Sequence, residues 1–419
     1  MKTFQHRLSM TLSLLVASSA SAADWKQFRG PGGLGASHET RLPVKWSSEV
    51  NVDWRTELPG PGTSSPIVLG DRIYLTCYTG YGLKPNEGDQ HNLMRHVLCV
   101  DRKSGKILWT RDFKPEQPES PYSPGNFSQH GYSSSTPATD GRRLYVFFGK
   151  SGLYCLDLTG KELWHASVGS GVNGWGSSNS PVLYKDLVFV NASVESGLLV
   201  AFNKLTGKEV WRAAGIGMSW NTPVLVDLPQ GGTELVVSER RIVLSFDPST
   251  GEELWRVGGF DSYVCPSVVT HKGIVYAVRD GSVAIRAGGR GDVTGSRVPW
   301  RIGPGSLVPS PVYHDGHLYW LRGGGTAFCV DATDGKTVYQ ERLSPKPGIV
   351  YASVVVADGK LYCVTQSDGV YVLAAKPKLE QLAHNVFEDD RSRTNASPVP
   401  HDGQLLMRTD RYLYCIGKK

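Results

Sequence analysis

The sequence predicts an all-β fold, an eight-bladed β-propeller of four-stranded antiparallel blades closed by an N-terminal strand that completes the last blade. Three observations support this prediction. One unit recurs at intervals mostly in the forties, and the last copy of that unit stops one strand short. Glycine (48 residues) and aromatic residues (10%) are abundant, as expected for many short strands joined by tight turns. Repetition allows 419 residues to form one domain instead of two or three.

The N-terminus has the pattern of a secretory signal. Lys2 and Arg7 give a basic start, residues 8–16 form a short apolar stretch, and small residues lead to a cleavage point near Ala22 or Ala23. The apolar stretch is too short to span a bilayer. We therefore expect residues 1–23 to be a signal peptide and residues 24–45 a lead segment. The mature protein is expected in the periplasm or secreted.

Each repeat unit begins with a small residue, usually followed by proline, and continues into an apolar strand. Successive units start 71, 44, 42, 43, 45, 42 and 45 residues apart, so only the first is expanded. A period in the forties with four short strands per unit is typical of propeller blades. The eight starts are at Pro66, Pro137, Pro181, Pro223, Pro266, Pro311, Ser353 and Pro398.

The end of each unit predicts a turn followed by a large aromatic ring. In "LDLTGKELW" (156–164), an Asp ends the third strand, where its carboxylate can accept backbone hydrogen bonds. The glycine supplies the positive φ of a type I turn with a bulge. The tryptophan then begins the outermost strand and fills the wedge between blades. The tryptophans expected in this structural position are Trp54, Trp109, Trp164, Trp211, Trp255 and Trp300, with Tyr339 in the sixth unit.

The two ends of the repeat region complement each other. Eight starts but seven complete units leave "RYLYCIG" (411–417) without an outer strand. "NVDWRTELPG" (51–60) carries Trp54 and has no preceding strands of its own. Pairing these segments closes the ring and removes an exposed sheet edge. Residues 46–419 are therefore expected to form a single propeller domain.

The seven cysteines follow the repeat and do not form a disulfide pattern. Cys99, Cys155, Cys329 and Cys415 occupy the same position in their units, and no two cysteines are adjacent or in a CxxC motif. A cysteine at a buried strand position behaves as a small apolar residue. We expect free, buried thiols.

The recurring unit resembles the pyrroloquinoline-quinone-like (PQQ-like) repeat of eight-bladed bacterial propellers. The resemblance covers roughly residues 46–419, and the leader "DWKQFRGPGGLGAS" (24–37) is similar to the start of exported members. One branch of the family contains quinone-dependent alcohol and sugar dehydrogenases. Another contains the propeller subunit of the outer-membrane β-barrel assembly machinery, which is a non-enzymatic scaffold. Shared repeats imply a fold and leave the function open.

The dehydrogenase branch implies a specific cofactor site. Its quinone lies between a tryptophan and a disulfide of adjacent cysteines, above a calcium ion. The closest cysteines here, Cys77 and Cys99, are 22 residues apart, and no calcium ligand set matches the family positions. We therefore predict no cofactor, PQQ included, and favour a protein that is not an enzyme.

The candidate binding site lies in the loops of one propeller face, around the mouth of the central channel. Trp175 and Trp220 are the best candidates because each lies in a Gly/Ser/Asn-rich loop directly before an inner strand. For any one residue, packing at the channel mouth is the more common role. The full set of candidate ligand-binding residues is His130, Tyr132, Trp175, Trp220, Tyr263, Tyr351, Arg279 and Arg322.

These features favour an exported, non-catalytic binding or scaffold module for protein or glycan ligands. The alternative is a diverged quinone- or metal-dependent oxidoreductase that uses the same face. His91, His96 and His130 could meet near Asp89, but their spacing is loose and no metal is predicted. The absence of long runs of like charge argues against nucleic acid as a partner. No membrane span is expected, and we expect a monomer.

Overall fold

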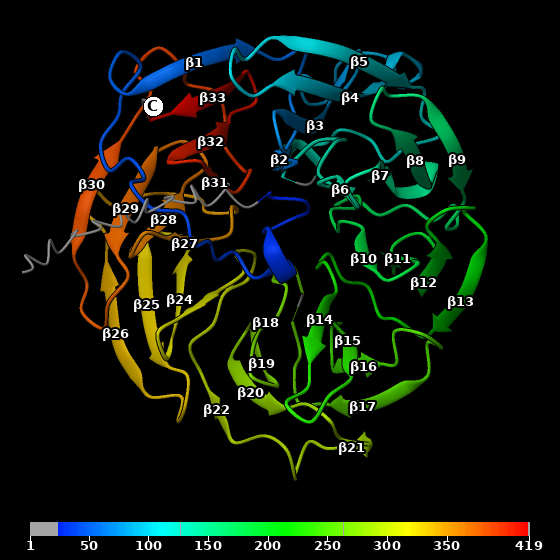
Figure 1. The fold of residues 1–419 in the computed structure, drawn as a ribbon, viewed down its shortest axis with the longest axis vertical. Helices are drawn as coiled ribbons and strands as arrows, with labels where there is room; N and C mark the ends of the chain where they lie inside the picture. Colours follow the sequence, from blue (N-terminus) through cyan, green and yellow to red (C-terminus); the bar gives the residue numbers. More distant parts are fainter. Residues whose placement is uncertain (1–23, 126, 263, 418–419) are drawn as a thin grey trace, which may run out of the picture.

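The computed structural model describes residues 24–125, 127–262 and 264–417 and confirms the predicted eight-bladed propeller. Eight antiparallel sheets surround a central axis (Figure 1). Each blade has four antiparallel strands that follow one another from the channel outward, and β21 (Gly291–Asp292) of blade five adds a fifth strand to blade four. In the last blade the outer strand is the first strand of the chain. The predicted signal peptide lies outside the described residues. Within the described part, no helix is long and apolar enough to cross a membrane.

The first four blades follow the repeat units in order. Their strands, from the channel outward, are β2 (Ile67–Leu69), β3 (Arg72–Thr79), β4 (Met94–Asp101) and β5 (Ile107–Phe113); β6 (Ala138–Thr139), β7 (Arg143–Phe147), β8 (Leu153–Asp157) and β9 (Glu162–Ala166); β10 (Val182–Tyr184), β11 (Leu187–Ala192), β12 (Leu198–Asn203) and β13 (Glu209–Ala214); and β14 (Val224–Asp227), β15 (Thr233–Ser238), β16 (Val243–Phe246) and β17 (Glu253–Val257).

The second half continues the same pattern. Short 3-10 turns occur at η1 (Pro31–Gly33), η2 (Gln90–Asn92), η3 (Phe127–Gln129) and η4 (Gly149–Ser151). The strands of blades five to eight are β18 (Val269–His271), β19 (Ile274–Val278), β20 (Ser282–Arg286) and β22 (Trp300–Ile302); β23 (Val312–His314), β24 (His317–Arg322), β25 (Thr326–Asp331) and β26 (Thr337–Arg342); β27 (Val355–Ala357), β28 (Lys360–Val364), β29 (Val370–Ala374) and β30 (Gln381–Asn385); and β31 (Val399–His401), β32 (Gln404–Arg408), β33 (Tyr412–Ile416) and β1 (Val52–Glu57).

The ring closes as the sequence predicts. β1 pairs antiparallel with β33, and Trp54 lies opposite Cys415 (Figure 1). Cys99, Cys155 and Cys329 lie opposite the outer-strand aromatic residue of their own blades in the same way. The small thiol therefore leaves room for the large ring beside it. All seven cysteines lie in the described part of the chain and none forms a disulfide, and six of them are buried.

Aromatic rings on the outer strands connect neighbouring blades. The Trp164 indole N–H donates to the Lys204 carbonyl in the turn of the next blade at 3.2 Å. Gly207 of that same turn packs on the ring so closely that a Cβ there would lie 2.7 Å from it. The same pair of contacts recurs for Trp54, Trp109, Trp211 and Trp300. Among the described residues, an apolar cluster lies at each of the eight blade interfaces.

Blade four departs from this pattern because blade five lacks the usual turn. Trp255 donates its indole N–H to the Glu234 carboxylate at 2.7 Å. The "GGRGD" segment of blade five instead extends outward, and β21 (Gly291–Asp292) pairs parallel with β17. Blade four therefore gains a fifth strand. Blade seven, which lacks tryptophan, has Ala383 at the outer-strand position.

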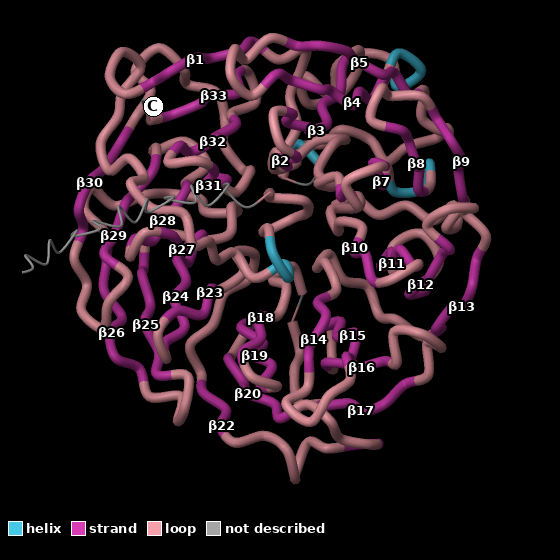
Figure 2. The backbone as a smooth tube through the Cα atoms, viewed as in Figure 1, coloured by secondary structure: helices cyan, strands magenta, loops and turns pink. Residues whose placement is uncertain are grey.

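The lead segment, residues 24–45, crosses the centre of the ring. Figure 2 shows η1 of this segment over the central channel. Arg29 anchors it: the buried guanidinium donates to the carbonyls of Leu34 (3.0 Å) and Pro311. Burial lowers the pKa of Arg29 to about 9. Just before β1, the backbone N–H of Trp46 donates to the Asn385 side-chain oxygen at 3.0 Å.

Candidate functional site

A cavity of about 300 Å³ lies in the central channel on the side of the between-blade loops. Its apolar lining includes Phe28, Trp175, Trp220, Leu307 and Tyr351. Serine and threonine hydroxyls supply most of the polar lining, together with a histidine, an asparagine and one thiol. Among the described residues, no Asp, Glu, Lys or Arg lines this cavity. The cavity wall is therefore uncharged at any pH at which its histidine is neutral.

A ring of eight hydroxyl-bearing residues surrounds the channel. The residue that begins each blade is Ser or Thr, and its backbone N–H donates to the hydroxyl oxygen of its counterpart in the next blade at 2.9–3.1 Å. Ser397 donates to Ser65 and closes the ring. The members are Ser65, Thr136, Ser180, Thr222, Ser267, Ser310, Ser353 and Ser397.

This hydroxyl ring also faces the cavity. Each oxygen accepts a backbone hydrogen bond, which leaves the hydroxyl proton available as a donor. Within the described part of the chain, none of the eight hydroxyls donates to another protein group. Six members line the cavity: Ser65, Thr222, Ser267, Ser310, Ser353 and Ser397. The ring thus offers several hydrogen-bond donors to an enclosed ligand.

Phe28 of the lead segment forms the floor of the cavity. A second hollow of about 390 Å³ lies beyond it, and both hollows share Phe28, Thr222 and Ser267 as lining residues. Phe28 therefore lies between the two hollows, beside Thr222 and Ser267 of the hydroxyl ring. Sequence reasoning missed Phe28 because the lead segment has no repeat register from which to place it.

The two tryptophans predicted as the best candidates both line the cavity. Trp220 is 8% exposed, and its indole N–H donates to the Gly176 carbonyl at 2.7 Å. Trp175 is 37% exposed, and its backbone carbonyl bonds His130 Nε2. Trp220 is thus held rigidly in the wall, whereas the Trp175 ring is partly open to solvent.

His130, also predicted, joins the wall from the long first-blade loop. Its Nδ1 bonds Ser134 Oγ at 2.7 Å, and Nε2 faces the carbonyl of Trp175. A carbonyl accepts only, so Nε2 carries the proton and Nδ1 accepts from the serine. Burial lowers the pKa of His130 to about 4, which makes the imidazole neutral at pH 7.

Two other groups in the wall are also held in their neutral forms. Burial raises the pKa of the Cys265 thiol to about 12 and raises that of Tyr351 above its ordinary value. Cys265 is therefore a poor nucleophile at neutral pH, although it lines the cavity. The wall contains neither a thiolate nor a charged base.

Three other predicted residues, Tyr132, Arg279 and Arg322, do not line this cavity. The Tyr132 hydroxyl donates to Ser120 O at 2.6 Å. Arg279 is 1% exposed and donates to backbone carbonyls, including that of Glu239 at 2.8 Å. Arg322 is exposed at the end of β24 and does not line the cavity. Tyr263 lies outside the described residues.

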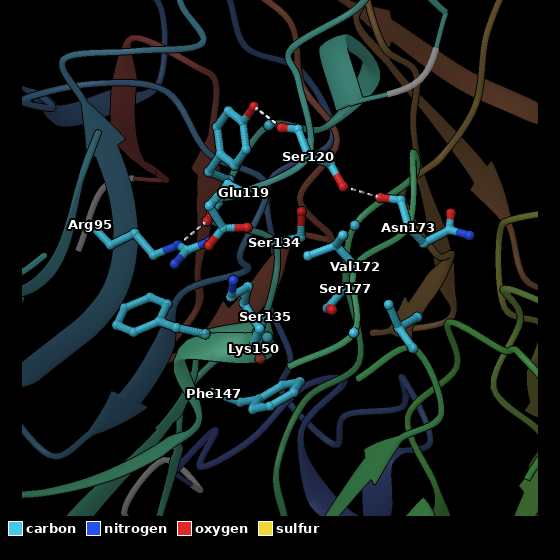
Figure 3. Close-up of a pocket in the computed structure, with 17 residues that line it drawn as sticks. Arg95, Glu119, Ser120, Ser134, Ser135, Phe147, Lys150, Val172, Asn173 and Ser177 are labelled. Atoms are coloured by element: carbon cyan, nitrogen blue, oxygen red, sulfur yellow. Dashed lines mark hydrogen bonds and ion pairs between the residues drawn. The ribbon is translucent and has the colours of Figure 1, made fainter. Parts of the chain in front are cut away.

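A smaller, charged pocket of about 30 Å³ adjoins the cavity and shares Ser134 with it (Figure 3). The buried Arg95 and Glu119 side chains form an ion pair at 2.6 Å along its wall. Its volume suits a water molecule better than an organic ligand. Nearby, the buried Glu195 carboxyl accepts from Ser177, and burial raises its pKa to about 7. Glu195 does not line the main cavity.

The first-blade histidines have separate partners. His91 bonds Asp89 at 2.8 Å on the surface, and His96 bonds Asp112 at 2.8 Å. His130 belongs to the cavity wall. Among the described residues, no group of three His, Cys, Asp or Glu side chains is arranged to hold a metal ion.

Comparison with known sequences places these features in a family. The model of the outer membrane protein assembly factor BamB family matches residues 94–257, 195–290 and 239–412. The chain belongs to this family. Tetrathionate hydrolase of Acidithiobacillus ferrooxidans is 22% identical over 179 residues, which cover 40% of this chain. The match spans about a third (32%) of that curated relative's own length.

Solved structures share the fold of this BamB family member. BamB from Moraxella catarrhalis has a TM-score of 0.59 at 12% identity, over 88% of this chain and 99% of that one. Quinohemoprotein alcohol dehydrogenase from Comamonas testosteroni has a TM-score of 0.65 at 13% identity, over 96% and 82%. A europium-containing methanol dehydrogenase has a TM-score of 0.61 at 13% identity, over 94% and 98%. These likenesses show the fold alone.

The cavity wall does not fit the cofactor of the quinone-dependent branch. That arrangement requires two adjacent cysteines and a calcium site, whereas one cysteine, Cys265, lines the wall and none of the carboxylates in the described chain does. The hydroxyl ring and the neutral imidazole offer hydrogen bonds and no metal-binding charge.

Proposed function

We propose that the mature chain is an exported, non-catalytic binding or scaffold module whose ligand occupies the cavity of the loop face. The observation that carries this proposal is the composition of the wall, in which aromatic rings and hydroxyl donors converge without a charged side chain. Neither His130 nor Cys265 is activated for catalysis. Burial lowers the pKa of His130 to about 4, so the imidazole beside the Ser134 hydroxyl is a weak base, and Cys265 is protonated at pH 7.

An uncharged glycan is the ligand that fits this wall best. The apolar face of a sugar ring can pack on Trp175 and Tyr351, and its oxygens can accept hydrogen bonds from the hydroxyl ring. A ligand carrying a net charge would lose its hydration without finding a counter-ion. The cavity volume suits one or two sugar residues at the end of a chain.

A protein ligand is the second candidate, because the between-blade loops of this face carry exposed apolar side chains, of which Leu307 also lines the cavity. Val172, Met218, Leu307 and Ile349 are 43–49% exposed on the loops of this face. Exposed apolar groups gathered around a hollow are typical of protein-binding surfaces. A scaffold role would also agree with the assembly-factor description of the family.

The location of the protein is part of the proposal. The basic, apolar and small-residue pattern of residues 1–23 supports export to the periplasm or beyond. We propose a monomer that binds no nucleic acid, since the ring closes on itself and no long basic run occurs in the sequence.

An array of neutral and acidic oligosaccharides tests the glycan proposal. The mature chain should bind neutral members, and the W175A/W220A double variant should lose about tenfold or more in affinity because two aromatic contacts are removed. Val338→Ala, an exposed apolar change on the outer strand β26, is the matched control and should bind normally. Undiminished binding by the double variant would show that the glycan does not bind at Trp175 and Trp220. Binding of acidic members alone would contradict the neutral ligand.

A further inference from the structure

The innermost strand of each blade presents one backbone edge to the channel, and the lead segment covers some of these edges. Trp25 N–H donates to Val68 O in β2 at 3.0 Å, and Val68 N–H donates to Trp25 O at 2.8 Å. The lead segment thus acts as an added extended chain on this edge. It makes the same kind of bond at two further blades: Thr139 N–H to Lys26 O (2.9 Å) in β6, and Val356 N–H to Gly35 O (2.8 Å) in β27.

In the described chain, the equivalent edges of blades three and four receive no backbone hydrogen bond from the lead segment, although η1 lies close to β14. Val68 lies opposite Ile73 in the hairpin of blade one. Leu183, opposite Val188, and Leu225, opposite Leu235, occupy the same position on the innermost strands of blades three and four. In an antiparallel pair, alternate residues direct their N–H and C=O away from the partner strand. The N–H and C=O of Leu183 and Leu225 therefore point towards the channel, as those of Val68 do.

These two edges line the hollow of about 390 Å³ beyond Phe28. The opposite wall is the lead segment itself, including Lys26 and residues 30–33. Among the described residues, no hydrogen bond from the lead segment reaches the backbone of Leu183 or Leu225. An open groove bordered by unpaired strand edges is the arrangement that accepts an additional strand.

We propose that this groove binds an extended segment of a partner polypeptide, which forms backbone hydrogen bonds with Leu183 and Leu225. The groove is continuous with the surface on which the lead segment already binds in this manner, and that continuity is the basis for choosing a polypeptide as occupant. Recognition through the backbone tolerates many sequences and disfavours proline at the paired positions. This site lies beyond the Phe28 floor and does not depend on the ligand of the loop-face cavity.

The chain itself supplies a substitution that tests the proposal. Blade eight carries Pro400 at the equivalent position, so proline is compatible with this backbone and removes only the N–H donor. L183P/L225P should therefore fold and lose the two donors. L183A/L225A, which retains both N–H groups, is one matched control. Thr270→Pro is the other, because Thr270 occupies the same register in blade five and does not line the groove.

The probe is a displayed library of random 12-residue peptides, selected on the mature chain and then measured singly by fluorescence anisotropy. Selected peptides should bind L183P/L225P about tenfold more weakly and both controls within about twofold, as expected for the loss of two hydrogen bonds. Bound peptide should also slow amide hydrogen exchange at residues 182–184 and 224–226 of the unmodified chain. This second readout remains valid if the proline variant folds poorly.

Three results would overturn the proposal. These are the absence of enriched peptides, equal affinity for the proline variant, and unchanged exchange at both edges. Light scattering provides a further test. A dimer that L183P/L225P abolishes would assign the groove to a second copy of the chain instead of a partner.

Discussion

At the scale of single residues, the outer-strand tryptophans and the hydroxyl ring each join one blade to the next. The turns that run from Asp or Asn to glycine, and the tryptophans that follow them, recur in register, so their positions could be predicted. The hydrogen bond from each indole to the next blade could not be predicted, since it depends on the angle between blades. The same holds for the hydroxyl ring. Ser180 and Thr222 each precede a proline at the start of a repeat unit, but the hydrogen bond between them forms only when two blades lie side by side.

The turn glycines should stabilise the fold in two ways, by adopting a positive φ and by leaving room for the tryptophan ring that packs on them. Gly207 has φ +70° and packs on Trp164, whereas Gly316 has φ +76° with open space around it. Gly316→Ala should cost about 1 kcal/mol from backbone strain. Gly207→Ala should lower the free energy of unfolding by roughly 2–4 kcal/mol, because the added methyl meets the ring. Urea unfolding measures both. Equal losses would show that the ring contact contributes nothing.

Glu195 should make stability depend on pH. Its pKa rises from an ordinary 4.5 to about 7 in the folded protein, so the folded state holds the proton more strongly than the unfolded state. Stability therefore falls as pH rises from about 4.5 to about 7 and is level above that. Glu195→Gln should remove this fall and be more stable than the parent at pH 8 by on the order of 2 kcal/mol.

Thermal unfolding of both proteins from pH 4.5 to 8 measures this difference. Glu162→Gln, at an exposed position on β9, is the matched control. Parallel pH profiles for the parent and Glu195→Gln would contradict a buried, protonated carboxyl.

At the scale of elements, the strands and the closure were predictable because strand period and turn chemistry are local. The lead segment was not. Its backbone bonds to Val68, Thr139 and Val356 join blades far apart in sequence, and no periodicity marks them. The candidate site likewise combines residues that the repeat locates with one residue that it does not locate. Trp175 and Trp220 could be found from their loop position, whereas Phe28 comes from an element without repeat register.

The closing strand β1 should stabilise the whole ring. Deletion of residues 46–58 removes the pairing of β1 with β33 and exposes the edge of blade eight. We expect the deletion to lower the midpoint temperature of thermal unfolding and to broaden the transition. A synthetic peptide of residues 46–60 should partly restore the midpoint temperature. An unchanged midpoint in calorimetry would show that β33 does not require its partner.

At the scale of the whole molecule, two features define the channel. The hydroxyl ring joins all eight blades in a closed circuit of hydrogen bonds, and the lead segment divides the channel at Phe28. One end is a neutral, aromatic cavity, and the other is a groove bordered by free strand edges. The fold thus places the two proposed binding surfaces on one axis. The repeat predicted a site at the loop face, whereas the groove could not be predicted because it depends on the path of the lead segment.

The most direct test of the central claim is a fluorescence titration of the mature chain with the tightest neutral oligosaccharide from the array. We expect a saturable change in tryptophan emission that W175A/W220A abolishes. We also expect an affinity that is constant from pH 5.5 to 8, because the pKa of His130 is lowered to about 4 and the wall stays uncharged. Retained affinity in the double variant, or an affinity that changes severalfold between pH 7 and 6, would contradict a neutral cavity as the binding site.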